Sequence, residues 1–186
     1  IGGDLLINDG HDHYITSKDR KTKLSCSVRG ASHMIVADNE NFEGAEWQKF
    51  EHDTPYILSE NDDLKHVYAK FKDLAGNESK LYQASILLDI TPPVDCTVSI
   101  NEGHENTNHP DKIVGIKIEA KTANFMMVSN YPDFRNARWE SYKKEVHSWQ
   151  LMGDEDGMKT IYCKFKDKAG NISNVFTDKI ELKRED

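Results

Sequence analysis

Aspartates in two nearly identical segments are the first residues of this sequence that could do acid–base chemistry. Asp73 lies in KFKDLAGNES (70–79) and Asp167 lies in KFKDKAGNIS (164–173). An aspartate shortly before Gly and Asn is also typical of a hairpin turn, in which the carboxylate accepts backbone N–H groups and Gly supplies a positive φ. No set of Ser, His and Asp recurs with them, so we interpret both aspartates as turn residues. A hydrolase would require that replacing Asp167 abolishes an activity.

Histidines and acidic loops raise the question of a metal site. The histidines lie in GHDHY and GHENTNH with different spacing, so we expect solvated loop residues at His11, His13, His104 and His109. The loops SENDDLK and GDEDGMK lack the alternating oxygen ligands of a helix–loop–helix calcium site, so we expect solvated turns at Glu60, Asp62, Asp63, Asp154, Glu155 and Asp156. A calcium ion shared by Asp89 and Asp95, at the joint between the halves of the chain, is a further hypothesis.

Aromatic residues offer two alternatives, core packing and sugar stacking. The segment DNENFEGAEWQKF (38–50) matches NYPDFRNARWESY (130–142), and the match aligns Trp47 with Trp139. We expect both tryptophans on a central strand, where they fill the gap between two sheets. Sugar stacking would instead require exposed rings, and the candidates are Trp47, Trp139, Trp149 and Tyr142. The exposure of the Trp149 ring is the most open question, because no aromatic residue is aligned with it in the first half.

Three cysteines leave at least one thiol unpaired if all bonding is internal. Cys26 is aligned with Ile118, and Cys163 is aligned with Ala69. Neither half therefore holds a cysteine pair that would bridge two sheets. We expect Cys26, Cys96 and Cys163 to be free and largely buried, which leaves the redox compartment open.

Short strands must position all of these groups. Val67, Ala69 and Phe71 alternate with polar residues before the first aspartate turn, and the second copy keeps the alternation. The predicted strands include 5–8, 24–28, 33–36, 56–58, 67–72 and 81–88 in the first half, and 98–101, 116–120, 125–128, 161–166 and 175–182 in the second. Because matching segments follow in the same order in both halves, the chain is an internal duplication of one unit.

The composition narrows the classes of function. The 186 residues carry a formal net charge of -8, and their lysines are dispersed, which argues against nucleic-acid binding. No apolar run approaches the roughly 20 residues that a membrane-spanning helix needs. Pro92 and Pro93 predict a stiff, extended joint between a unit at 1–92 and a unit at 93–186. The chain does not begin with Met, so we expect it to be a piece of a larger protein.

The hairpins D-x-A-G-N-x-S at 73–79 and 167–173, combined with D-x-T-P-P at 89–93, resemble bacterial and phage immunoglobulin-like (fibronectin III-like) tandem repeats. The resemblance covers essentially the whole chain. It implies seven-stranded sandwiches that are strung together in surface adhesins, appended to secreted enzymes, or built into virion decoration and tail proteins.

We therefore predict an all-β chain of two tandem immunoglobulin-like antiparallel β-sandwiches, each with strands in the order A, B, C, C′, E, F, G. The leading functional hypothesis is a non-catalytic structural or adhesive module of a larger extracellular, cell-surface or virion protein. Its partners would be other repeats or subunits of that assembly. The alternative is a carbohydrate-binding accessory region of a secreted enzyme. We expect no catalytic, cofactor-binding or metal-binding residues, apart from the calcium hypothesis at the joint.

Overall fold

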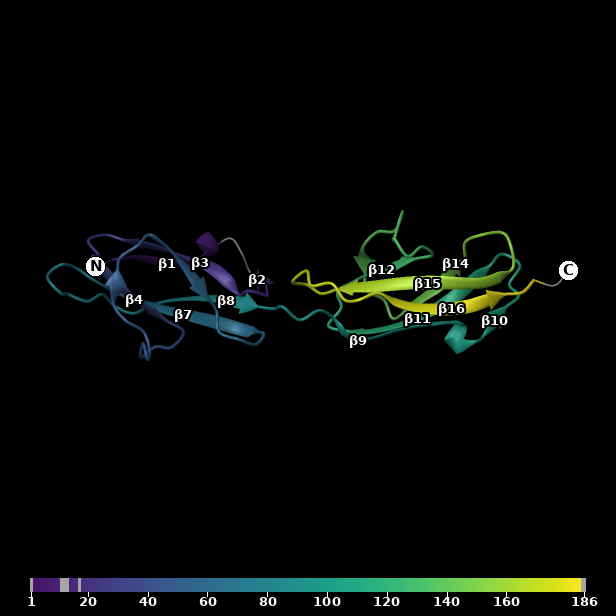
Figure 1. Cartoon of the computed structure of the whole chain (residues 1–186), viewed down its shortest axis with the longest axis horizontal. Helices are drawn as coiled ribbons and strands as arrows, with labels where there is room; N and C mark the ends of the chain where they lie inside the picture. The colour runs from purple at the N-terminus through teal and green to yellow at the C-terminus, as the bar shows by residue number, and fades with distance from the viewer. Residues whose placement is uncertain (1, 11–13, 17, 185–186) are drawn as a thin grey trace. The chain divides into compact units, whose positions relative to one another are not determined.

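The chain forms two compact units, Ile1–Thr91 and Pro92–Asp186 (Figure 1). The computed structural model describes residues 2–10, 14–16 and 18–184. The observed boundary falls one residue before the one suggested by the sequence. Each unit is described by itself below.

The first unit is a sandwich of a three-stranded and a five-stranded sheet. The sheet orders are β1-β3-β6 and β2-β8-β7-β4-β5. The strands are β1 (Gly3–Ile7), β2 (Tyr14–Ile15), β3 (Lys21–Val28), β4 (His33–Ala37), β5 (Gln48–Lys49), β6 (Asp53–Ile57), β7 (Asp63–Lys72) and β8 (Tyr82–Leu88). A 3-10 turn, η1 (Asn8–Gly10), follows β1.

The second unit repeats this topology. Its sheet orders are β14-β11-β9 and β10-β16-β15-β12-β13. The elements are β9 (Val94–Ile100), η2 (Asn101–Gly103), β10 (Asn106–Thr107), β11 (Ile113–Lys121), β12 (Phe125–Ser129), β13 (Glu140–Ser141), β14 (Glu145–Gln150), β15 (Gly157–Lys166) and β16 (Phe176–Leu182). The prediction of two all-β immunoglobulin-like sandwiches is confirmed.

One short strand in each unit was not predicted. β2 pairs in parallel with β8, and β10 pairs in parallel with β16, so the described residues of each unit form eight strands where seven were expected. These strands are two residues long, which is too short to show the alternation from which strands are recognised in a sequence.

Each sandwich has its own hydrophobic core. Phe71 on β7 and Phe165 on β15 are completely buried, as the alternation along these strands predicts. The first core combines side chains from β1 and β3 with side chains from β4, β7 and β8, so the two sheets face each other. Full burial of one such phenylalanine stabilises a fold by about 1.5–3 kcal/mol.

The repeated turn after β7 is held by its own side chains. Asp73 Oδ1 accepts the N–H of Asn77 at 2.9 Å, and Gly76 adopts a φ of 88°. Around Asp167, the same carboxylate oxygen accepts the N–H groups of Gly170 and Asn171 at 2.7 and 2.8 Å. These contacts are the turn chemistry that we inferred from the sequence.

The serine that ends the motif joins the turn to the preceding strand. Ser79 Oγ accepts the N–H of Phe71 at 3.0 Å and donates to the carbonyl oxygen of Lys80 at 2.7 Å. Ser173 accepts the N–H of Phe165 at 3.0 Å in the same way. Asp, Gly, Asn and Ser of the motif therefore all have structural roles in both units.

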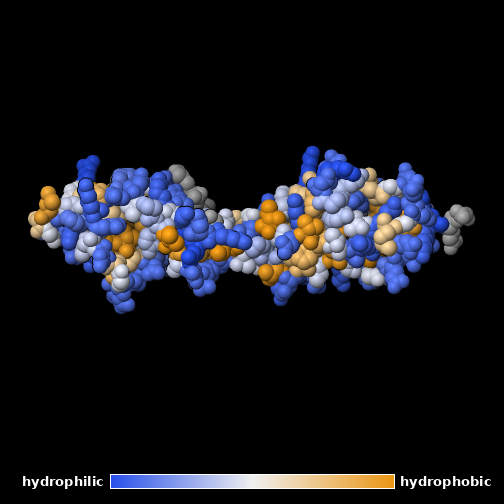
Figure 2. All heavy atoms as spheres, in the orientation of Figure 1, coloured by the Kyte–Doolittle hydropathy of each residue, from blue (hydrophilic) through white to orange (hydrophobic). Residues whose placement is uncertain are grey.

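Figure 2 shows hydrophilic side chains over much of the visible face of both units, with hydrophobic patches between them. Within the described part of the chain, no helix has the length and apolar character needed to span a membrane.

Candidate functional site

Trp47 and Trp139 do not lie between the sheets, so their predicted position on a central strand is wrong. Each half-buried ring belongs to the loop just before a two-residue strand, β5 or β13. Lys72 Nζ lies 4.3 Å from the Trp47 ring centroid, and Lys166 Nζ lies 4.6 Å from that of Trp139. Because each lysine follows a core phenylalanine along its strand, the tryptophans contact the outer face of the five-stranded sheet.

The backbone of this loop explains the error. Phe42 and Gly44 have φ values of 57° and 75°, and Phe134 and Asn136 repeat them at 54° and 63°. A strand does not accommodate two such residues so close together, so the chain folds back over the sheet. The recurring tryptophans stack with lysine ammonium groups by cation–π attraction. One face of each ring is therefore occupied, which argues against sugar stacking there.

Phe50 and Tyr142 are the aromatic residues that enter the cores at this point. Their rings make edge-on contacts with the core phenylalanines at centroid distances of 5.9 and 6.4 Å. The Tyr142 hydroxyl also donates to the Ile118 carbonyl at 3.3 Å and accepts the Ala120 N–H at 3.1 Å. Tyr142 is thus a core residue and not a stacking platform. The signal was present, since an aromatic residue ends both aligned segments.

Trp149 does have an aromatic counterpart, contrary to the sequence alignment. Trp149 pairs with Val114 on β11, and Tyr56 pairs with the equivalent Thr22 on β3. Both rings are half-buried against the cores, and Trp149 Nε1 donates to Asn130 Oδ1 at 3.2 Å. A cavity of about 250 Å³ lies beside Trp149, and one of about 520 Å³ lies beside Tyr56. Trp149 therefore stays a candidate contact for a ligand.

Two of the acidic loop residues hold the chain where it leaves each unit. The Asp62 carboxylate accepts the N–H groups of Ile90 and Thr91, both at 3.0 Å. Asp156 accepts the N–H of Arg184 at 2.6 Å and its Nε at 2.7 Å. Burial acts to raise the pKa of Asp62, but the hydrogen bonds from Thr91 and Ile90 outweigh it, so the pKa of this carboxyl is lowered. The hydrogen bonds from Arg184 lower the pKa of Asp156. Both residues are exposed, as expected for solvated turns, and their carboxylates also clamp the chain.

The histidines do not build a metal centre in the described part of the chain. No three His, Cys, Asp or Glu side chains among those residues are grouped so that they could hold a metal ion. His104 Nδ1 contacts the carbonyl oxygen of Asn101, and His109 Nδ1 accepts the N–H of Asp111 at 3.2 Å. His11 and His13 lie outside the described residues.

The two aspartates proposed for a calcium site each have contacts within their own unit. Asp95 forms an ion pair with Lys121 at 2.7 Å. The backbone N–H of Asp89 donates to the carbonyl oxygen of Ile15 at 3.0 Å. Calcium at the joint therefore stays a prediction.

All three cysteines are free and buried, as the sequence predicts. Burial raises the pKa of Cys26 to about 11 and that of Cys163 to about 12. Burial also raises the pKa of Cys96. These thiols are protonated at neutral pH and do not act as nucleophiles.

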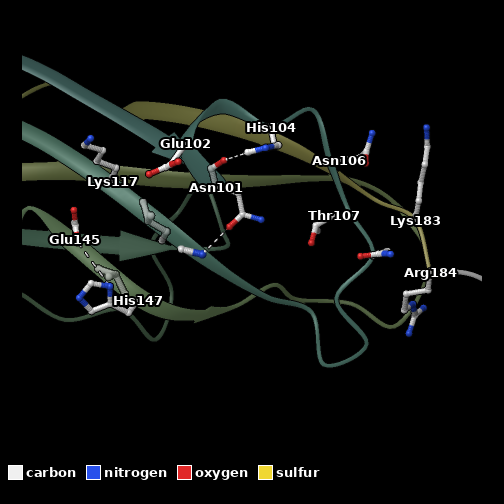
Figure 3. Close-up of a pocket in the computed structure, with 14 residues that line it drawn as sticks. Asn101, Glu102, His104, Asn106, Thr107, Lys117, Glu145, His147, Lys183 and Arg184 are labelled. Carbon is white, nitrogen blue, oxygen red and sulfur yellow. Dashed lines mark hydrogen bonds and ion pairs between the residues drawn. The ribbon is translucent and has the colours of Figure 1, made fainter.

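A groove of about 800 Å³ on the outer face of the three-stranded sheet is the candidate site of the second unit (Figure 3). It is bounded by η2, β10, β11, β14 and the segment after β16. Figure 3 shows Glu102, Lys117, Glu145 and His147 at one end and Lys183 and Arg184 at the other. Neutral polar residues also line the groove: Asn101, Asn106, Thr107 and Asn108.

The two ends of the groove differ in how their charges are paired. Lys183 pairs with Glu181 at 2.8 Å, and Arg184 is held by the Asp156 clamp, so the cations at one end are neutralised. At the other end, Glu145 Oε2 lies 3.7 Å from His147 Nδ1. No acidic oxygen of the described residues lies within 4.0 Å of Lys117. This end offers carboxylates to a cation.

Equivalent asparagines relate the groove to the first unit. Asn8 Oδ1 accepts the N–H of Lys23 at 3.0 Å, and Asn101 Oδ1 accepts the N–H of Gly115 at 2.8 Å. Both asparagines have a left-handed backbone, with φ values of 48° and 45°. Gly115 therefore occupies the position that Lys23 has in the first unit.

Lys23 is the centre of a polar network in the first unit. Its Nζ lies 2.8 Å from Asp9 Oδ2 and 3.7 Å from Asp53 Oδ1. Ser25 Oγ donates to Asp9 at 2.6 Å and lies 2.9 Å from Asp53. The hydrogen bond to Asp9 raises the pKa of Lys23, and the hydrogen bond from Ser25 lowers the pKa of Asp53. An ammonium group thus lies between two carboxylates here.

The second unit keeps the carboxylates but lacks this lysine. Glu102 follows Asn101 as Asp9 follows Asn8, and Glu145 pairs with Lys117 as Asp53 pairs with Ser25. A Cβ atom at Gly115 would meet only Asn101 Oδ1, at 3.9 Å, among atoms within 4 Å. The space that the Lys23 side chain fills in the first unit is therefore open.

A β-bulge accompanies the change. The ladder of β11 and β14 shifts register between Val114 and Ile116, whereas β3 and β6 pair continuously from Lys21 to Ser25. The extra residue beside Gly115 brings His147 to the groove. Bulges redirect side chains and are frequent near binding sites. The sequence reading did not find this site, although aligning Lys23 with Gly115 would have marked it.

Comparison with known proteins adds no function to this geometry. No protein-family model matches the sequence, and no curated protein matches it. Among solved structures, fibronectin(III)-like modules of Clostridium thermocellum CbhA are similar at 12% identity and a TM-score of 0.47, over 97% of this chain and 94% of that chain. The D00-D0 domain of intimin is similar at 14% identity and a TM-score of 0.35, over 96% and 99%. Both scores are too low to bear on function, and the description of the fold rests on the pairing of the strands.

Proposed function

We propose that this chain is a non-catalytic structural module of a larger extracellular, cell-surface or virion protein, in which two sandwiches act as a spacer or as decoration. The motif residues that could have done chemistry support this role. The carboxylates of Asp73 and Asp167 accept hydrogen bonds from their own turns in both units. This repeated structural use of the motif is the observation that carries the proposal.

The exit from the first unit supports a spacer in particular. The Asp62 carboxylate holds the N–H groups of Ile90 and Thr91, and Pro92 and Pro93 follow directly. Proline fixes φ and limits the preceding residue to extended conformations. A clamped exit followed by two prolines is expected to restrict how the second unit leaves the first.

Small-angle X-ray scattering tests this role, because a spacer needs a defined length. We expect a single arrangement of the two units to fit the scattering of the wild-type chain. A double variant, Pro92→Gly with Pro93→Gly, is expected to require an ensemble of arrangements, since Gly loosens the joint. A wild-type curve that needs as broad an ensemble as the double variant would rule out the spacer.

Carbohydrate binding is the second candidate, and the cavity beside Trp149 is the observation that favours it. Glycan-array binding that is lost in Trp149→Ala, with the fold retained by circular dichroism, would support it. Trp139→Ala is the matched control, because that ring is covered by Lys166 on the outer face. Equal loss in both variants would point to damage to the fold and not to a sugar site.

A further inference from the structure

We propose that the groove of the second unit binds a lysine side chain presented by a partner protein. The ammonium group of that lysine would lie between Glu102 and Glu145, where the first unit holds its own Lys23 between Asp9 and Asp53. The inference goes beyond the spacer role, and it holds whether or not the units act as a spacer.

The internal repeat identifies the ligand. In the first unit the lysine comes from β3, and its Nζ reaches Asp9 at 2.8 Å and Asp53 at 3.7 Å. In the second unit Gly115 replaces that lysine, and the carboxylates that bordered it are kept as glutamates. A ligand that fills the open space needs an ammonium group on a slender aliphatic stem, which describes a lysine side chain.

The surroundings of the groove agree with a cationic ligand. The formal net charge of the chain is -8, which favours encounter with a positively charged partner. The neutral side chains of Asn106, Thr107 and Asn108 offer hydrogen bonds to the backbone of a segment that carries the lysine. The cations at the far end are already neutralised by Glu181 and Asp156.

Lys117 is the one lining residue that opposes the ligand by its charge at this end of the groove. It occupies the place of Ser25, whose hydroxyl bridges the two carboxylates in the first unit. We expect the lysine site to be weak, in the millimolar range, because exposed ion pairs contribute little and Lys117 competes for the same carboxylates. Lys117→Ser is expected to tighten binding roughly threefold.

The probe for the test is Nα-acetyl-lysine amide, titrated into the complete chain and followed by the NMR shifts of backbone amides. We expect the Gly115, Lys117 and His147 amides to shift together. The Nε-acetylated form of the probe, which has no charge, is expected to bind about tenfold more weakly or worse. Absence of these shifts, or equal shifts with the uncharged probe, would overturn the proposal.

Variants copied from the first unit make the test specific. Gly115→Lys restores the internal ammonium group and is expected to abolish binding. Gly115 does not have a positive φ, and a Cβ has room there, so the variant is expected to fold. Lys23→Gly should open the corresponding space in the first unit and create a second set of shifts. Persistence of the original shifts in Gly115→Lys would overturn the proposal.

Variants that remove one negative charge provide an independent test of the lysine site if Gly115→Lys fails to fold. Glu145→Gln is expected to weaken binding, whereas Glu119→Gln, on the same face of β11 but outside the groove, should leave it unchanged. Equal effects of both changes would show that only overall charge matters and would refute the site. Putrescine and glucosamine also carry primary amines, and tighter binding of either one would refute the assignment to lysine.

Discussion

Tyr142 carries a hydroxyl group that its counterpart Phe50 lacks. Because this hydroxyl accepts the Ala120 N–H and donates to the Ile118 carbonyl, we expect Tyr142→Phe to destabilise the second unit by about 1 kcal/mol. The melting temperature of that unit should fall by roughly 4–8 °C. Differential scanning calorimetry measures this directly. The control is Phe50→Tyr, which adds a hydroxyl at the equivalent position of the first unit. If this change stabilised the first unit by as much as Tyr142→Phe destabilises the second, the effect could not be assigned to the hydrogen bonds of Tyr142.

Residues whose partners are close in sequence could be predicted, and residues whose partners are distant could not. Asp73, Gly76 and Ser79 were interpreted correctly because their contacts lie within one hairpin. Trp47 was misplaced because its position depends on a loop that folds back onto Lys72. The groove was missed because it depends on a side chain that Gly115 does not have, and only the alignment of Lys23 with Gly115 marks it in the sequence.

The carboxylates of Asp62 and Asp156 hold the segments that follow β8 and β16. Asp62→Ala removes the acceptor for the Ile90 and Thr91 N–H groups, so we expect hydrogen exchange at both amides to accelerate at least tenfold. Asp63→Ala is the control, because the Asp63 carboxylate accepts the N–H of Leu64 instead. Unchanged exchange in Asp62→Ala would show that the clamp does not hold the exit.

Acid is expected to weaken the same elements. The pKa values of Asp53, Asp62, Asp73 and Asp156 are lowered in the folded chain. Their unfolded values are about 3.9, so the unfolded state binds more protons as the pH falls. Their contribution to stability is complete above about pH 4 and is lost as the pH falls through the lower folded values. We therefore expect the melting temperature of the chain to fall as the pH is lowered from 7 to 3. Asp156→Asn should make this fall smaller, because it removes one of the titrating carboxylates.

At the scale of the element, the sequence revealed the long strands and missed the short ones. The C-terminal parts of β7 and β15 were predicted, at 67–72 and 161–166, because these residues show a clear alternation that ends in a recognisable turn. The parallel pairing of β2 with β8 was not predicted, because two residues carry no periodic signal. The bulge between β11 and β14 appears in the sequence only as a one-residue change of offset, because Asp53 is equivalent to Glu145 whereas Tyr56 is equivalent to Trp149.

For the whole molecule, the duplication predicts two units that unfold as separate bodies. The core around Phe71 draws only on the first unit, and the core around Phe165 draws only on the second. We expect Phe71→Ala to destabilise the first unit by about 3–5 kcal/mol and to leave the unfolding of the second unit unchanged. Phe165→Ala should do the reverse. Chemical denaturation followed by NMR of both units measures this, and a joint transition that shifts equally in both variants would disprove independence.

Alkylation of the buried cysteine thiols would report when each unit opens. Cys26 is completely enclosed in the first sandwich, and Cys163 is completely enclosed in the second. An alkylating reagent reaches each sulfur only when the surrounding sandwich opens, so short pulses of iodoacetamide would mark the two events on different peptides. Mass spectrometry would then follow the breathing of both repeats in one unlabelled, unmutated chain.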